Sequence, residues 1–409
     1  MALPDGVASV RDLDLEHQRT FIRLDLDCSL TDEATPDAAD DARIQAALPT
    51  IRLALDKGAR VVLAAHRGTP KGRGYEEKLS LEPVGARLAE LLGVELLFPH
   101  EDCVGDAARK VVRELRDGQI VLLENLGFHP EEEQGDEPFA QKLAEFADVY
   151  VDDALAVADR GWASVFALPR LVRARGMGLA FERELEALAR LQAPERPFLA
   201  VLGGEMSQDR IALFERLLER ADAVLVGGQL ATTFFAATGG SIGASHVDAD
   251  KLALARTLLD KARFGRGGRS VEIVLPVDVM VAPTRDASEG SIYDATRVPS
   301  GEQVLDVGPR TIEAFATRVV AAKTVLFSGP VGRYENPRFA DGSRGVARAL
   351  ADAPGFTVVV GGDTAAAVRA AGDEVVSKID HVSAGDAAAF ALLTGKRLPG
   401  VEALRGLRS

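Results

Sequence analysis

Short apolar runs alternate with longer stretches of helical spacing along the whole chain, and this alternation is what most constrains its fold. Nearly all of the runs are continuously apolar, which is typical of strands covered on both faces. Alternation of such strands with helices favours a parallel sheet. The runs are Phe21–Asp25, Arg60–Ala64, Ile120–Glu124, Val149–Asp152, Phe198–Leu202, Ala223–Val226, Glu272–Leu275, Thr324–Phe327 and Thr357–Val360. The pattern predicts an α/β fold with parallel sheets flanked by helices.

One helical pattern lies where two domains would meet. Phe181, Leu185, Leu188 and Leu191 recur three or four residues apart, and Pro194 follows them. A chain of 409 residues is long enough for two large domains. We expect this helix to join them, although an ordinary surface helix has the same pattern.

Composition excludes several classes of partner. The formal net charge of −14 argues against a nucleic-acid partner, which calls for a basic surface. No apolar run approaches the ~20 residues of a membrane helix. The N-terminal segment has acids and lacks the apolar core of a signal peptide. The only two cysteines, Cys28 and Cys103, make no disulfide framework. We expect a soluble, cytoplasmic protein.

Glycine-rich segments follow four of the strands in the second half. Parallel sheets bind ligands at the carboxyl ends of their strands, and glycine allows close approach of the backbone. The segment Gly361–Gly362–Asp363–Thr364 leads directly into a helix, whose N-terminus suits a phosphate, although Asp363 and Thr364 could simply cap it. No P-loop or G-x-G-x-x-G fingerprint is present, so we expect a nucleotide site of another kind. The other segments are Gly203–Gly204, Gly227–Gly228 and Gly329–Pro330–Val331–Gly332.

Charged residues follow the strands of the first half instead. A cluster of histidine and arginine side chains could hold an anionic metabolite, although each alone is more often a surface charge. The candidates are Asp25, Asp27, Arg43, His66, Arg67 and Arg160.

Many segments resemble phosphoglycerate kinase, and they occur in that family's order across nearly the whole chain. They include IRLDLDCSL, DARIQAALPTI, AAHRGTPKG, VLLENLGFHPEEE, ADVYVDDALAVADRGWAS, APERPFLAVLGG, VLVGGQLATTF, LPVDVMVA, LDVGPRTIEAF, FSGPVGRYE, VVVGGDTAAAV and GKRLPGVEAL. The resemblance implies two doubly wound, Rossmann-like parallel-sheet domains joined by a hinge helix. A substrate domain would span residues 1–175, the hinge helix 176–195 and a nucleotide domain 196–392, with a tail of residues 393–409 returning to the first domain. It also implies a monomer that takes 3-phosphoglycerate, or its acyl phosphate, and Mg-ADP or Mg-ATP.

Several functional positions of the family are kept. By resemblance, Asp25 holds the glycerate hydroxyl, Arg43 lies beside the transferring group, and His66 and Arg160 match phosphate-site positions. Arg210 keeps a cation at a lysine position, and Glu335 contacts the ribose. The remaining nucleotide positions are Gly204, Gly228, Gly361, Gly362, Thr364 and Asp363, the last directed toward the metal.

Other positions depart from the family pattern, and they cluster around the transfer site. Met206 replaces the lysine that neutralises the transferring phosphoryl group, while Thr69 and Gly127 replace phosphate-binding arginines. Arg67 and Lys71 lie close to Thr69 in sequence and could compensate in part. The other departures are Asp27 and Ser328 for two asparagines, Asp159 and Trp162 for two histidines, and Ala384 and Asp386 in the loop Ser383–Ala387.

These departures lead to three hypotheses about function. Phosphoryl transfer depends on positive charge at the moving group, and loss of one well-placed donor costs about 10²–10³ in rate. We therefore expect a degenerate paralogue that still binds a nucleotide or an anionic metabolite. The alternatives are an active phosphotransferase, with the family's substrate or a changed acceptor, and a structural or interaction protein that binds neither. Trp162, the only tryptophan, would report a ligand in the substrate-side loop unless it is an ordinary packing residue.

Overall fold

The computed structural model describes residues 6–30, 38–100, 102–265 and 270–406. The chain divides into two compact units. Unit 1 comprises Met1–Glu186 and Gly395–Ser409, and unit 2 comprises Ala187–Thr394. Among the described residues, no helix is long and apolar enough to cross a membrane.

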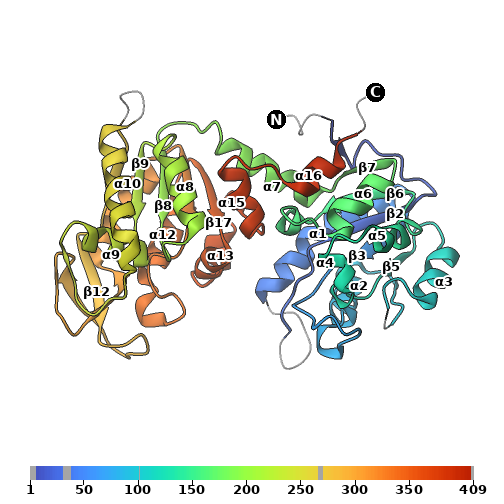
Figure 1. Ribbon diagram of the computed structural model, residues 1–409, viewed down its shortest axis with the longest axis horizontal. Coiled ribbons are helices and arrows are strands. Elements are labelled where there is room, and N and C mark those ends of the chain that lie inside the picture. Colours follow the sequence, from blue (N-terminus) through green and yellow to red (C-terminus); the bar gives the residue numbers. More distant parts are fainter. Residues whose placement is uncertain (1–5, 31–37, 101, 266–269, 407–409) are drawn as a thin grey trace. The chain divides into compact units, whose positions relative to one another are not determined.

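Unit 1 is built on a seven-stranded parallel sheet of order β1-β7-β6-β2-β3-β5-β4 (Figure 1). Its strands are β1 (Ala8–Ser9), β2 (Arg19–Leu24), β3 (Arg60–Ala64), β4 (Leu96–Leu97), β5 (Ile120–Leu122), β6 (Val149–Asp153) and β7 (Ala174–Met177). Its helices are α1 (Ala38–Asp56), α2 (Glu82–Leu92), α3 (Asp106–Glu114), α4 (Pro130–Glu133), α5 (Glu137–Ala144), α6 (Leu168–Leu171) and α16 (Pro399–Leu404), with α7 (Leu179–Arg190) spanning the division between the units. The central strands are mainly apolar on both faces because helices cover both, with Thr20, Arg23 and Asp152 as fully buried exceptions.

Unit 2 has a six-stranded parallel sheet of order β11-β9-β8-β16-β17-β18. These strands are β8 (Phe198–Leu202), β9 (Ala223–Val226), β11 (Glu272–Val274), β16 (Thr324–Ser328), β17 (Phe356–Val360) and β18 (His381–Val382). The helices are α8 (Gln208–Leu218), α9 (Gly228–Ala237), α10 (Leu252–Phe264), α11 (Pro309–Ala321), α12 (Asp341–Asp352), α13 (Gly362–Arg369), α14 (Asp373–Val376) and α15 (Asp386–Leu393). Alternate strand residues such as Val325 and Phe327 pack with α11 and α12 in one apolar core.

A small antiparallel sheet, of order β13-β12-β15, adjoins α9 in unit 2. Its strands are β12 (Asp278–Ala282), β13 (Ser291–Asp294) and β15 (Gln303–Val307), and β10 (Ser241–Ile242) pairs separately with β14 (Arg297–Val298). β12 and β15 supply one wall of the cavity described below.

Helix α7 begins at the end of β6 in unit 1. The Oδ1 atom of Asp153, the last residue of β6, accepts hydrogen bonds from the backbone N–H groups of Ala180 (2.8 Å) and Phe181 (3.0 Å). Thr50 of α1 accepts a third, from Leu179 N at 2.8 Å. These contacts satisfy first-turn donors that would otherwise be unpaired, so the helix has a fixed origin on the sheet of unit 1.

The C-terminal segment packs on unit 1. Helix α16 contacts β7 and α6, and Figure 1 shows it in red among the blue and green elements of that unit. Gly400 N donates to Ala158 O at 2.9 Å, and Gly406 N donates to Gly6 O at 2.9 Å. Unit 1 is thus assembled from both ends of the described chain.

The predicted fold class is confirmed, because both large sheets are parallel and are covered by helices. Every predicted strand is present within a few residues, and the helical pattern at Phe181, Leu185 and Leu188 lies in α7. Among the strands that the sequence did not predict, β1, β4, β10, β14 and β18 have two residues each and carry too little periodicity to detect. The sequence also missed the longer strands β7, β12, β13 and β15, of four or five residues each.

Candidate functional site

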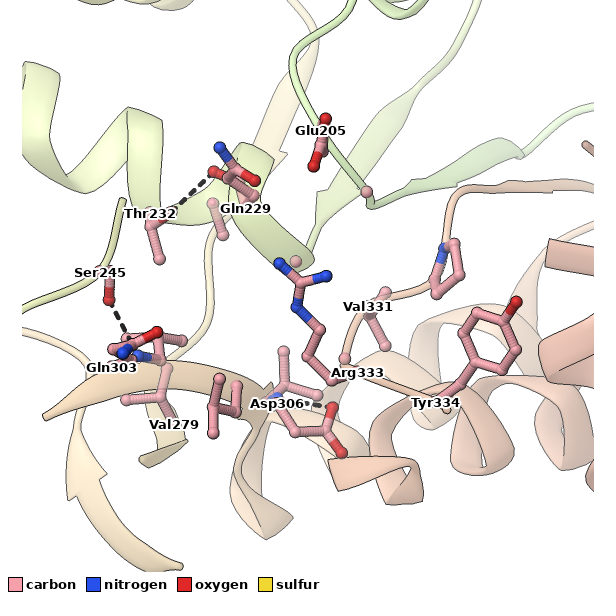
Figure 2. A pocket seen from close by; sticks show the side chains of 18 of the residues that line it. Glu205, Gln229, Thr232, Ser245, Val279, Gln303, Asp306, Val331, Arg333 and Tyr334 are labelled. Atoms are coloured by element: carbon pink, nitrogen blue, oxygen red, sulfur yellow. Dashed lines mark hydrogen bonds between the residues drawn. The ribbon is translucent and has the colours of Figure 1, made fainter. Parts of the chain in front are cut away.

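A cavity of about 320 Å³ opens in unit 2 where strands β8, β9 and β16 end. Figure 2 shows its wall formed by Thr232, Ser245, Val279 and Gln303 on one side. Five of the nucleotide candidates line it, namely Gly204, Arg210, Gly228, Glu335 and Asp363. Residues as far apart in sequence as Gly204 and Asp363 are therefore brought to one cavity by the parallel topology, as expected for a doubly wound sheet.

Glycine is required here by close backbone packing. A Cβ built on Gly203 would lie 2.1 Å from Pro330 O, and one on Gly227 would lie 2.5 Å from Val331 Cβ. The loops after β8, β9 and β16 therefore press against one another, and the two glycines serve this packing before they serve any ligand. Gly204 and Gly228 do face the cavity, and both have positive φ.

Arg210 lies in the first turn of α8 and is mostly buried. Its Nη1 donates to Ser328 Oγ at 3.0 Å, and its guanidinium carbon lies 5.5 Å from the centre of the Phe390 ring. Burial lowers the pKa of Arg210, while the negative charges of Asp386 and Asp363 raise it. Ser328 in turn donates to Val360 O at 2.9 Å. The arginine is thus held in place at the end of the cavity.

The segment Gly361–Thr364 forms the start of α13. Thr364 Oγ1 donates to Val360 O (3.0 Å) and accepts from Gly329 N (2.7 Å), so this side chain ties the β16 turn to β17. Asp363 is exposed at the cavity edge. Burial, and then the negative charges of Asp363 and Glu335, raise the pKa of Tyr334.

Asp386 lies over the first residues of α13. A Cβ built on Gly361 would lie 3.7 Å from Asp386 Oδ1, and one on Gly362 would lie 3.7 Å from Oδ2. A carboxylate therefore occupies the neighbourhood of a helix N-terminus, where free N–H groups and the helix dipole favour negative charge. Met206 lies in the loop between β8 and α8, and its apolar side chain is buried with 2% exposure.

In unit 1 the predicted substrate residues meet at the ends of β2 and β3, but they are bonded to one another. Arg43 Nη1 donates to Asp25 Oδ2 at 2.8 Å. Burial raises the pKa of Asp25, and the charge of Arg43 opposes this. Asp27 Oδ1 accepts from Gly68 N at 2.6 Å, and its Oδ2 lies 3.8 Å from His66 Nε2.

Arg23 lies beside the predicted substrate residue His66, and sequence reasoning missed it. It is fully buried, and its guanidinium contacts His66 Nδ1 (3.1 Å) and Ser164 Oγ (2.9 Å). Burial, then the charge of Arg23, lowers the pKa of His66 to about 3, so the imidazole is neutral. The signal was a single arginine inside an otherwise apolar strand, TFIRL.

Arg67, a predicted substrate-binding residue that could compensate in part for Thr69, forms hydrogen bonds within unit 1. It is buried, and it donates to three backbone carbonyls: Nε to Cys28 O (2.7 Å), and Nη1 to Lys78 O and Ser80 O (2.9 Å each). Through these hydrogen bonds, the Arg67 guanidinium joins three segments of the chain.

Three further departures, Trp162, Asp159 and Gly127, lie in unit 1. Trp162 packs edge-on against the His66 ring, with centroids 5.0 Å apart, and Arg160 lies 6.0 Å from the Trp162 ring and 3.6 Å from Asp159. A Cβ on Gly127 would lie 3.1 Å from Asn125 Oδ1 and 3.2 Å from Pro70 Cγ, so this position fits glycine closely.

One group of potential metal ligands occurs among the described residues, namely Asp102, Cys103 and His129 in unit 1. His129 Nε2 already has a hydrogen-bond partner, Asp102 Oδ1, at 3.0 Å. Burial and the charge of Asp102 raise the pKa of the Cys103 thiol, which favours the neutral form. A structural Asp–His hydrogen bond beside a buried thiol accounts for the group.

Comparison with known proteins agrees with this architecture. The family model for phosphoglycerate kinase matches residues 10–396. A phosphoglycerate kinase of Anaeromyxobacter sp. strain Fw109-5 is 44% identical over 404 residues, covering 98% of this chain and all of that protein. One from Pelotomaculum thermopropionicum is 44% identical over 398 residues, covering 97% and 98%. The solved phosphoglycerate kinase of Coxiella burnetii is 32% identical with a TM-score of 0.84, covering 97% of this chain and 98% of that one. The chain therefore belongs to the phosphoglycerate kinase family.

Proposed function

We propose that this protein is a nucleotide-binding member of the family in which phosphoryl transfer is impaired. The family reaction moves a phosphoryl group between 1,3-bisphosphoglycerate and ADP, giving 3-phosphoglycerate and ATP. The observation that carries the proposal is the Asp386 carboxylate over the start of α13, combined with an intact cavity beside it. The Asp386 carboxylate would repel a long phosphate chain, while the cavity would still accept a nucleoside.

The cavity supports nucleotide binding by its size and its lining. Apolar walls with a few placed polar groups are typical of such sites, and Val279, Leu305 and Val331 provide the apolar part. Glu335 would bind the ribose hydroxyls, and Arg210 a phosphate. Asp363 would hold Mg²⁺ with phosphate oxygens, because an exposed carboxylate at the cavity edge suits that ion.

The geometry argues against fast transfer. Met206 provides no charge where the moving group needs one, and neither Thr69 nor Gly127 supplies a cation. In unit 1, the charge of Arg43 is already balanced by Asp25. We therefore propose that a small phosphorylated metabolite binds weakly at Arg43, His66 and Arg160, with Asp25 and Asp27 opposing its charge.

A coupled assay with 3-phosphoglycerate and Mg-ATP, run beside calorimetry with ADP, tests the proposal. We expect ADP to bind while turnover stays about 10² or more below that of an active family member assayed in parallel. Met206→Lys should raise turnover, and Met206→Leu, which preserves volume without charge, should not. Turnover equal to that of the active relative would contradict the proposal that phosphoryl transfer is impaired.

Active phosphoglycerate kinase is the second candidate. Its support is the retention of Arg210, Glu335 and Asp363 around one cavity, together with relatives of that name at 44–45% identity. The same assay separates the two. Absence of ADP binding at millimolar concentration would leave the third hypothesis, a structural role.

We also propose a cytoplasmic monomer. Both cysteines are free and buried, which fits a reducing compartment. Size-exclusion chromatography with light scattering should give the 43.4 kDa of one chain, and a mass near twice that value would refute the monomer.

A further inference from the structure

Arg333 extends into the middle of the nucleotide cavity. It follows the turn after β16, where its N–H donates to Leu305 O at 2.8 Å and its carbonyl accepts from Asn336 N at 3.0 Å. Both backbone bonds fix the base of the side chain. Figure 2 shows the side chain rising between Asp306 on one side and Gln229 and Glu205 on the other, with its guanidinium in the open space.

The guanidinium has no partner within the described part of the chain. Among the described residues this side chain forms no ion pair, hydrogen bond or ring contact, whereas Arg210 in the same cavity bonds Ser328 and half-buried arginines such as Arg318 pair with acids. Asp306, its neighbour, has its own partners in the N–H groups of Val307 and Gly342, and burial raises its pKa to about 7. Asp306 therefore does not neutralise Arg333.

An unpaired, partly buried guanidinium favours an anion from the ligand. Arginine presents a planar fork of donors that matches phosphate, and such charge-assisted bonds are stronger than neutral ones. The alternative anion position, the start of α13, lies under Asp386. Asp386 thus opposes a phosphate at the N–H groups of Gly361 and Gly362, and Arg333 offers a second cation in the cavity besides Arg210.

We infer that Arg333 binds a phosphate of the nucleotide and selects ligands whose phosphate lies inside the cavity. Two positions on the ligand satisfy this, a short 5′-phosphate chain folded back into the cavity or a phosphate on a ribose hydroxyl. The inference rests on the proposed function, since it requires that the cavity bind a nucleoside.

Calorimetry on the full chain tests the assignment with adenosine, AMP, ADP and adenosine 2′,5′-bisphosphate. The proteins are wild type, Arg333→Ala, Arg333→Lys and the control Arg338→Ala, which removes an exposed charge outside the cavity. Arg333→Ala should weaken the phosphate-bearing ligand about tenfold or more and adenosine less than twofold. Arg333→Lys should recover part of the loss, and Arg338→Ala should match wild type. Circular dichroism melting verifies that each variant is folded.

The pattern across ligands identifies the phosphate. A loss shared by AMP, ADP and the bisphosphate, all of which carry a 5′-phosphate, places it on the 5′ chain, and a loss confined to the bisphosphate places it on the ribose. If Arg333→Ala leaves the affinity ratio of each nucleotide to adenosine unchanged, Arg333 binds no phosphate, although the proposed function stands. If wild type binds none of the four compounds at millimolar concentration, both the inference and the proposed function fall.

Discussion

Units 1 and 2 both place charged side chains at the carboxyl ends of parallel strands, yet they use them differently. In unit 1 the charges are satisfied internally, through Arg43 with Asp25, Arg67 with backbone carbonyls, and Arg23 with His66. In unit 2 the strand ends enclose a cavity into which Arg333 projects, and its side chain has no partner among the residues that the structure describes. The contrast indicates that charge in unit 1 now mainly stabilises the fold, while charge in unit 2 remains available to a ligand.

The strongest challenge to this contrast is removal of Arg23. Glu132 and Asp152 are buried carboxyls whose pKa values are raised by burial and lowered by Arg23, so Arg23→Met leaves them without a nearby cation. We expect a loss of about 3–5 kcal/mol in the free energy of unfolding. Urea unfolding followed by Trp162 fluorescence measures it, because the only tryptophan lies in unit 1. The exposed Arg173→Met should change stability by no more than about 0.5 kcal/mol. A loss below about 1 kcal/mol for Arg23→Met would contradict a structural role.

The second prediction concerns the pH dependence contributed by His66. Its pKa of about 3 in the folded protein lies below the unfolded value of about 6.5, so between these values only the unfolded chain gains the proton. Acidification through this window therefore destabilises the wild type. Relative to pH 7, the stability difference at pH 4.5 should shift by about 2–3 kcal/mol in favour of His66→Asn.

Urea titrations at several pH values measure that difference. Asp152 and Asp153, whose pKa values are raised by burial to about 7 and about 6, titrate in both proteins and serve as an internal reference. A difference that stays constant with pH would show that His66 is not held neutral.

A smaller effect should follow from Asp386→Gly in unit 2. Removal of a carboxylate beside α13 should improve ADP affinity about tenfold, or ~1–2 kcal/mol, because a phosphate would no longer meet a like charge. Asp386→Asn, which keeps the size of the side chain, should give most of the gain, and the exposed Asp373→Asn should give none. Calorimetry reports the affinities. Equal ADP affinities in wild type and the three variants would show that Asp386 does not oppose a phosphate, and the proposed function would lose its main support.

The smallest expected effect is the response of Trp162 to 3-phosphoglycerate. Since His66 is neutral and Arg43 is paired, the metabolite should change the fluorescence little below millimolar concentration. A saturable change at micromolar concentration would show that unit 1 remains a functional anion site and would break the contrast between the units.

The sequence predicted the two parallel sheets, because continuous apolar runs such as Phe198–Leu202 have few other interpretations. The family motifs also predicted that Arg210, Glu335 and Asp363 share one site, and the three residues line one cavity. It could not predict that Arg67 is buried under three carbonyls, or that the glycines after β8 and β9 are required by neighbouring loops. These outcomes depend on contacts between segments distant in sequence, which no local pattern encodes. The sequence identifies Asp386 as a departure from the family pattern, but its position over Gly361 and Gly362 is a tertiary feature.

The attachment of α16 to unit 1 affects how the protein is made. A ribosome completes residues 6–186 long before residues 399–404, with the whole of unit 2 synthesised in between. The surface formed by β7 and α6 therefore remains uncovered throughout that interval, and unit 2 can fold first as a unit on the nascent chain. The unit synthesised first is the last to be completed.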